Sequence, residues 1–219
     1  MGLRPEIRNV YIAIAINLVL SLFLTINYDI GVGIVYTAMS IVSGAIYFIS
    51  LNILKRRGIQ PIGLEFGRGT DWFLDALVGL GVAVFFILGF AVDNSFSMGL
   101  PQVPLSIGTG LIFIVRFFLA PTAEGILFRG AILTLAQVLR IPFFITVIVQ
   151  AVAFSLFHLT AYGDSITSAG GAFLAAVIFG IVIGLVTKWR RNVLVEFVSH
   201  APINIALTIA NLAVAAVAG

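Results

Sequence analysis

A carboxylate and a guanidinium lie close together in the middle of a chain that otherwise contains little charge. They are Glu124 and Arg129, within the stretch 121–130. The chain has only nine aspartates and glutamates, and Glu124 follows a segment, 112–120, that is apolar except for Arg116. An ionisable group in such a setting is costly, and it usually faces a partner or a water-filled cavity and takes part in function. Glu124 is therefore the first candidate for chemistry.

The two histidines of the chain, His158 and His200, can reach the level of Glu124. Glu124 lies 17 residues before Ile141, where a turn between two helices is predicted, and His158 lies 17 residues after it. In an antiparallel hairpin these two side chains can therefore face each other. His200 lies about 12–14 Å into the last apolar segment, counted from Arg191 at 1.5 Å per residue. His200 lies at the same depth as Glu124 and His158 if the turn of the hairpin projects beyond the bilayer.

A polar stripe on the last apolar segment adds a second carboxylate and an amide. Glu196, His200 and Asn204 recur at every fourth position, so they share one face of a helix. A carboxylate, two imidazoles and an amide are the groups needed to hold and deprotonate a water. Glu124 would be the general base, and histidine and asparagine would donate to the oxyanion formed when a peptide carbonyl is attacked. The alternative for Glu196 is a residue near the membrane interface, close to Arg191.

The composition is typical of a polytopic membrane protein. Of the 219 residues, 61% are hydrophobic and 10% charged, and the mean hydropathy is +1.17. A water-soluble domain would need more polar surface. The length allows about seven spans of roughly 20 residues in a single transmembrane domain, residues 1–219. The absence of cysteine excludes disulfides and thiolate sites, and no basic run is long enough for a nucleic-acid surface.

We expect an all-α bundle that crosses the lipid bilayer seven times. The predicted helical segments are 9–27, 34–54, 73–92, 106–140, 142–159, 172–188 and 193–217. The fourth would extend about 50 Å, which exceeds the hydrocarbon thickness, so it is predicted to kink at Pro121, to project beyond the bilayer, or both. The first has no small-residue cleavage site and is expected to be retained. Residues 59–72 are predicted to form an interfacial connector, and 160–171 a loop.

Basic residues predict the orientation in the cell membrane. Alternate connections carry Arg4 and Arg8, residues 55–57, Arg129 and Arg140, and residues 188–191. The other connections carry an aspartate each, at positions 29, 93 and 164, and no lysine or arginine. By the positive-inside rule the N-terminus is cytoplasmic and the C-terminus lies outside.

Three short motifs occur in order: Glu124 to Arg129, Phe154 to His158, and His200 to Asn204. Together they resemble the CAAX protease and bacteriocin-processing family of intramembrane glutamic proteases. Members of that family look like Glu-Glu-x-x-x-Arg, Phe-x-x-x-His and His-x-x-x-Asn on three helices. The resemblance covers about residues 120–204. It implies an all-helical endopeptidase in the lipid bilayer that cleaves a membrane-associated peptide or protein without a metal cofactor.

The resemblance also implies a role for each candidate residue. Glu124 matches the glutamate that, with a histidine, activates water. The remaining catalytic positions, including the oxyanion hole, correspond to His158, His200 and Asn204. Arg129 matches the arginine of the first motif. Since it lies about 140° round an α-helix from Glu124, it is expected to brace a loop or a neighbouring helix.

One position departs from the family pattern. The second glutamate of the pair is replaced by Gly125. The retained first glutamate leaves catalysis possible, but a group that normally helps to organise the site is missing. We hypothesise that Glu196, one turn before His200, supplies the missing carboxylate.

Other functions remain open at this stage. Glu124, His158 and His200 form an acceptable zinc ligand set with an open position for water, although the chain contains no His-Glu-x-x-His motif. A non-catalytic scaffold or immunity protein could retain the protease fold, and Gly125 would then be a sign of lost activity. A small transporter could use Glu124 and His158 as a proton relay, although the absence of an inverted repeat argues against it. Glu124 and Arg129 could also be a purely structural charge pair.

Overall fold

A computed structural model describes residues 12, 32–62, 69–92, 117–118, 120–157 and 166–218. Within these ranges every regular element is a helix, as predicted. The helices are α2 (Val32–Arg56), α3 (Gly69–Val92), α5 (Ala120–Glu124), η3 (Gly125–Ala131), α6 (Ile132–Val138), α7 (Phe143–Phe157), α8 (Ile166–Arg190) and α9 (Leu194–Ala218). The predicted helix 9–27, apart from Ile12, and most of 106–119 lie outside the described residues.

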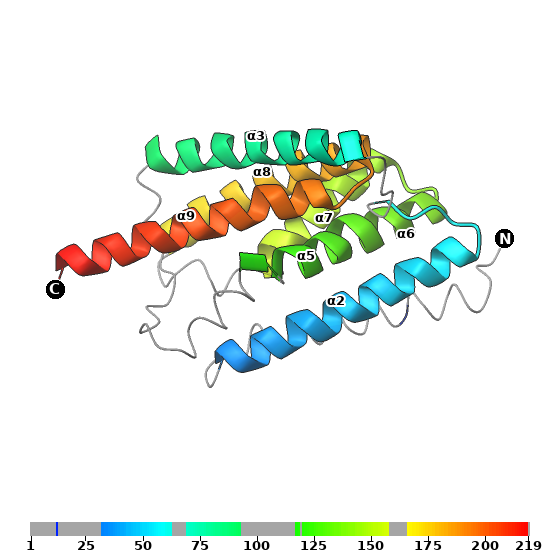
Figure 1. Ribbon diagram of the computed structural model, residues 1–219, viewed down its shortest axis with the longest axis horizontal. Coiled ribbons are helices and arrows are strands. Elements are labelled where there is room, and N and C mark those ends of the chain that lie inside the picture. The colour runs from blue at the N-terminus through cyan, green and yellow to red at the C-terminus, as the bar shows by residue number, and fades with distance from the viewer. Residues whose placement is uncertain are drawn as a thin grey trace.

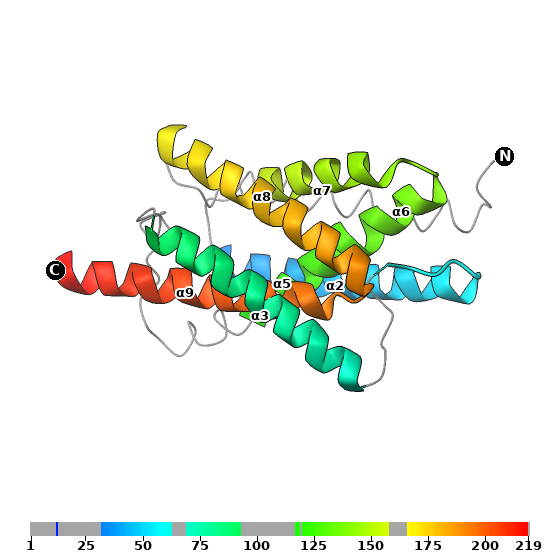
Figure 2. The same cartoon turned by 90° about the horizontal axis from the view of Figure 1, so that it is seen from above.

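The helices run roughly along one axis, with α2 and α3 on opposite sides of the others (Figure 1). Between them lie the continuous run α5–η3–α6 and helices α7, α8 and α9. The most extensive packing joins α3 to α9 and α7 to α8, while α2 packs on α5 and η3. Seen from above, α3 crosses close to α9 (Figure 2). The run α5–η3–α6 is therefore covered from several directions, and it carries Glu124 and Arg129.

Two of the helices are long and apolar enough to cross a membrane by length and composition. They are Asp71–Gly89 within α3 and Gly170–Arg190 within α8. Shorter apolar helices occupy Phe143–Leu156 and Leu194–Ala210. The outward faces of these helices carry large apolar side chains such as Phe73, 67% exposed, and Phe144, 70% exposed. Such faces suit a lipid environment, while the number of crossings stays a prediction.

Small residues allow two helix pairs to cross closely. A Cβ atom added to Gly180 on α8 would lie 2.9 Å from the Cα of Ala151 on α7. One added to Gly79 on α3 would lie 2.9 Å from the carbonyl oxygen of Val195 on α9. Backbones that approach so closely gain van der Waals contact, which is the main source of helix association in lipid. These crossings hold α7 against α8 and α3 against α9.

Two helix ends confirm the turns that the sequence predicts. After α2, Gly58 has φ +80°, and the N–H of Ile59 donates to the carbonyl of Leu54 at 3.1 Å. After α6, Arg140 has φ 56°, and the N–H of Ile141 donates to the carbonyl of Ala136 at 2.9 Å. A left-handed residue followed by such a bond closes a helix by satisfying its last carbonyl groups. The hairpin turn between α6 and α7 therefore falls where the register argument requires it.

Two predicted boundaries were wrong. Helix α8 begins at Ile166, inside the predicted loop 160–171, and α3 begins at Gly69, inside the predicted connector 59–72. Glycine costs about 1 kcal/mol relative to alanine in a helix interior, yet Gly170 and Gly171 lie within α8. The apolar residues that follow them favour helix strongly enough to outweigh that cost. Pro121 is the second residue of α5, and the predicted kink there stays a prediction.

The turn between α8 and α9 is fastened to α3 by a buried aspartate. Asp75 is 2% exposed and accepts hydrogen bonds from Arg190 Nε at 2.5 Å and Asn192 Nδ2 at 2.8 Å. Asn192 Oδ1 in turn accepts the backbone N–H of Leu194, the first residue of α9, at 3.0 Å. Asp75 therefore fixes the beginning of α9, which carries the polar stripe.

We predict that Asp75→Asn lowers the unfolding temperature more than the same change at Asp71. Asp71 lies one turn earlier on α3 and is exposed. The substitution at Asp75 removes the charge from one buried and one partly buried hydrogen bond, and a hydrogen bond to a charged group contributes about 1.5–3 kcal/mol. Thermal unfolding of the purified protein in detergent measures the difference. Equal shifts for the two variants would contradict the anchoring role.

Candidate active site

The segment that carries Glu124 and Arg129 is wound as a π-helix. Glu124 is the last residue of α5, and η3 follows it from Gly125 to Ala131. At the end of η3 the N–H of Ile132 donates to the carbonyl of Leu127, five residues earlier. In a π-helix, residues five apart are neighbours. The separation of about 140° expected for an α-helix therefore does not apply, and Arg129 lies nearer to the Glu124 side of the helix than predicted.

Arg129 is the largest fully buried side chain in the described part of the chain. Its Nη1 atom lies 3.3 Å from Oε1 of Glu196 on α9, and both side chains are 0% exposed. Among the described residues, none of its guanidinium nitrogens has a hydrogen-bond partner of standard geometry. The prediction that Arg129 braces a neighbouring helix fits this contact. The Glu196 side chain is enclosed in this contact, while its depth relative to the membrane interface stays a prediction.

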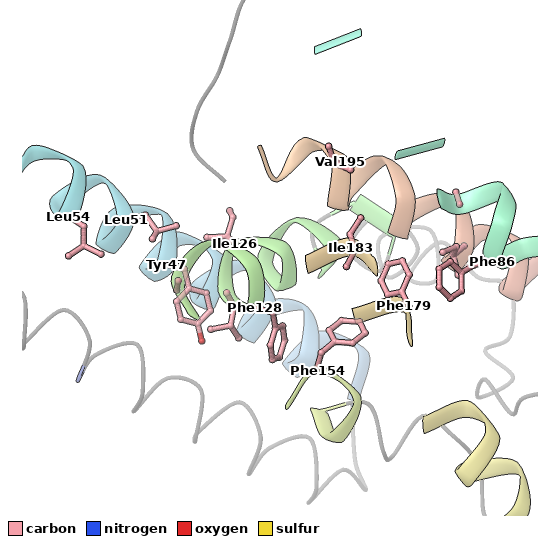
Figure 3. Packing of buried hydrophobic residues seen from close by; sticks show 14 residues of the cluster. Tyr47, Leu51, Leu54, Phe86, Ile126, Phe128, Phe154, Phe179, Ile183 and Val195 are labelled. Atoms are coloured by element: carbon pink, nitrogen blue, oxygen red, sulfur yellow. The ribbon is translucent and has the colours of Figure 1, made fainter. Parts of the chain in front are cut away.

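Three phenylalanine rings surround the guanidinium. The Cζ atom of Arg129 lies 4.4 Å from the ring centre of Phe154, 5.8 Å from that of Phe128 and 5.9 Å from that of Phe179. All three belong to the hydrophobic core (Figure 3). A cation within about 6 Å of an aromatic ring is attracted by the ring electrons, most strongly where water is excluded. The rings and the Glu196 carboxylate together compensate for the lost hydration of the guanidinium.

His200 joins the same cluster from the second turn of α9. Its Nδ1 atom lies 3.3 Å from Glu196 Oε1 and 3.7 Å from Glu124 Oε2. Its ring packs edge-on against Phe154 at 5.7 Å and Phe179 at 5.4 Å between ring centres. The side chains of Glu124 and His200 are both 8% exposed. Since a carboxylate oxygen can only accept a hydrogen bond, the contact with Glu196 forms in the tautomer that carries hydrogen on Nδ1.

The structure thus brings together four of the six predicted site residues. They are Glu124, Arg129, Glu196 and His200. Asn204 lies one turn after His200 on α9 and is partly buried. His158 lies outside the described residues, just beyond the end of α7, so its predicted place opposite Glu124 stays a prediction.

The cluster is suited to proton transfer. Two carboxylates face one guanidinium, which leaves one negative charge before the imidazole is considered. An unbalanced charge is expensive away from water, and one proton shared among His200, Glu124 and Glu196 would neutralise the cluster. A carboxylate and an imidazole that exchange a proton within hydrogen-bond reach are the components of general acid–base catalysis.

The described side chains do not test the zinc alternative. No group of three or more His, Cys, Asp or Glu in that part of the chain is placed to hold a metal ion. His158, the third ligand of that alternative, lies outside it.

Two features of the site were not found from the sequence. One is the π winding of η3, and the other is the set of rings around Arg129. Gly125 and Gly130, which lie within η3, are a weak signal for the winding because glycine relaxes the constraint on helix geometry. Phe154 is the first residue of the Phe-x-x-x-His motif, but the spacing of that motif does not predict the contact of the Phe154 ring with Arg129.

One comparison with known proteins found a family. Residues 106–206 match the family of type II CAAX prenyl endopeptidases described as Rce1-like. The resemblance to the CAAX protease and bacteriocin-processing family is therefore confirmed, and every candidate site residue falls within the matched segment. No curated protein and no solved structure matches the chain significantly.

We predict that Phe154→Leu lowers stability and that Phe85→Leu does not. Phe154 is 3% exposed and contacts both Arg129 and His200, whereas Phe85 on α3 is 67% exposed. Loss of a desolvated cation–π contact costs about 2 kcal/mol, and the smaller side chain leaves a gap in the core. Thermal unfolding of the two variants side by side measures this. If Phe85→Leu lowers the unfolding temperature as much as Phe154→Leu does, the contact between the Phe154 ring and the Arg129 guanidinium does not add to stability.

Proposed function

We propose that this membrane protein, whose residues 106–206 form an Rce1-like region, is an intramembrane endopeptidase. The observation that carries the proposal is the approach of Glu124 on α5 to His200 on α9, with 3.7 Å between Oε2 and Nδ1. A buried carboxylate beside an imidazole, next to a guanidinium, is an arrangement in which water can be made nucleophilic.

The proposed reaction uses Glu124 as the general base. Glu124 takes a proton from a water molecule as the oxygen attacks the carbonyl carbon of the scissile peptide bond. His158, which follows α7 in the sequence, is proposed to hold that water. His200 and Asn204, one turn apart on α9, donate to the oxyanion of the tetrahedral intermediate. When the carbon–nitrogen bond breaks, the proton held by Glu124 passes to the leaving amine.

The position of the cluster favours a substrate that approaches from the cytoplasmic side. His200 is the seventh residue of α9, so it lies about 9 Å along the helix from Leu194. The same end of the bundle carries the basic ends of α2 and α8, with Lys55, Arg56, Lys188 and Arg190. By the positive-inside rule this end is cytoplasmic. We propose a membrane-associated peptide or protein substrate, with a prenylated C-terminal tail as the first class to test.

We predict that Glu124→Gln lowers kcat at least about 100-fold, because removal of a general base typically costs 10²–10⁴ in rate. Asn204→Ala is expected to lower kcat by about 10²–10³, the loss measured for single oxyanion donors. Cleavage of a farnesylated C-terminal peptide and of its unprenylated form, with protein in liposomes, measures both. Asp71→Asn, an exposed acid on α3, is the matched control and keeps the wild-type rate.

The same assay separates the alternatives. No cleavage of any peptide by the wild type would favour the non-catalytic scaffold, whereas an unchanged rate in Glu124→Gln would overturn the role of Glu124 as general base. Inactivation by a chelator, reversed by zinc, would favour the metal site.

The orientation can be tested directly because the chain has no cysteine. Gln60 is exposed beyond the basic end of α2, and Gly170 is exposed near the opposite end of α8 with open space around its Cβ position. We predict that a membrane-impermeant maleimide labels Gly170→Cys but not Gln60→Cys in intact cells, and the reverse in inverted vesicles. Labelling of Gln60→Cys from outside would reverse the proposed topology.

A further inference from the structure

Glu196 occupies a position that the proposed mechanism leaves without a task. It is the third residue of α9, and it is 0% exposed. A single oxygen, Oε1, lies 3.3 Å from Arg129 Nη1 and 3.3 Å from His200 Nδ1. Glu196 therefore connects the π-helix η3 to the imidazole on its own helix. Fully buried carboxylates are rare because their desolvation is expensive, so this one needs a reason.

Glu196 also fills the space above Gly125. A Cβ atom added to Gly125 would lie 2.6 Å from Cγ, 3.2 Å from Cβ and 3.8 Å from Cδ of Glu196. Real atoms do not approach as closely as 2.6 Å. Because Cγ is in the middle of the Glu196 side chain rather than at its tip, the clash cannot be relieved by moving the carboxylate alone. A side chain at position 125 and the side chain of Glu196 thus exclude each other.

Of the two carboxylates beside His200, Glu196 is the one placed to orient the ring. Its oxygen lies at 3.3 Å from Nδ1, against 3.7 Å for that of Glu124. A carboxylate that accepts from Nδ1–H fixes the plane of the imidazole, and when the ring is protonated its Nε2–H can still donate to the oxyanion. Glu124 is then not required to hold the ring and is available to the water.

We infer that Glu196 is a positioning residue of the active site, and that the glycine at position 125 exists to admit it. In this arrangement α9 supplies the second carboxylate of the site. A glutamate at position 125 on η3 would need the space that Glu196 occupies, so it could take this role only if Glu196 were absent. The inference rests on the proposed function for its catalytic meaning. Its structural part, that the Glu196 carboxylate serves both Arg129 and His200, stands on the contacts alone.

The exchange of the two residues tests this inference. Four proteins are compared: wild type, Glu196→Gly, Gly125→Glu, and the double variant Gly125→Glu/Glu196→Gly. Each single variant is expected to lower kcat at least about tenfold with a much smaller change in KM, as for other carboxylates that orient a catalytic imidazole. The double variant is expected to recover at least half of the lost kcat on a logarithmic scale, because the clash is removed and a carboxylate is restored.

A second measurement does not depend on cleavage. The chain has only two histidines, so ¹⁵N-histidine labelling gives two pairs of ring-nitrogen signals, and the pair that remains in His158→Gln belongs to His200. Glu196→Gln, which keeps the volume, is expected to shift the Nδ1 resonance of His200. The double variant is expected to move it back toward the wild-type value.

These outcomes separate the inference from the proposed function. If Glu124→Gln abolishes cleavage while Glu196→Gly retains the wild-type kcat, the enzyme assignment stands and the positioning role is wrong. If no protein cleaves any peptide, the enzyme assignment fails, and the ¹⁵N shifts alone decide whether Glu196 holds His200. A double variant that is no better than the single variants in kcat and in the His200 signal overturns the inference.

Discussion

The enclosed guanidinium of Arg129 is the constraint on which the rest of the structure depends. A charge removed from water costs several kcal/mol unless partners replace its hydration. Here the Glu196 carboxylate approaches it at 3.3 Å, and the Phe154 ring centre lies 4.4 Å away. These groups come from η3, α9 and α7, so the three helices cannot separate without exposing an unpaired charge. The same contact places His200, one turn beyond Glu196, beside Glu124.

Close backbone approach is what makes this enclosure possible in an apolar medium. Lipid gives no hydrophobic drive for helices to associate, so contact area and polar pairs must hold them. Glycines at the crossings of α3 with α9 and of α7 with α8 bring the backbones together. Asp75 then fixes the start of α9 through Asn192. The close crossings and the Asp75 hydrogen bonds therefore both stabilise the position of α9, the helix that carries Glu196, His200 and Asn204.

Much of the site could be predicted from residue types and spacing. Glu124 and His200 were singled out as ionisable groups in apolar helices, and the stripe from Glu196 to Asn204 follows from the period of the helix. The placement of Arg129 could not be predicted in the same way, since it rests on a π winding that shifts every later residue around the axis. Its contact with the Phe154 ring joins residues from different helices, and no local pattern records such a pair. His158 lies outside the described residues, so its part of the prediction is not tested.

Composition and periodicity predict a helical membrane protein, its main helices and the turn at residues 140–142. They can do so because the hydrophobic period and the need to satisfy backbone polar groups are local properties of the sequence. They also identify which polar side chains are out of place in an apolar chain. Whether the Glu196 side chain is enclosed in the cluster or faces outward depends on how α9 meets η3. That packing is set by a missing Cβ atom at Gly125 and by charge balance across helices. Such contacts are decided by volume and electrostatics between distant segments, which one-dimensional spacing does not contain.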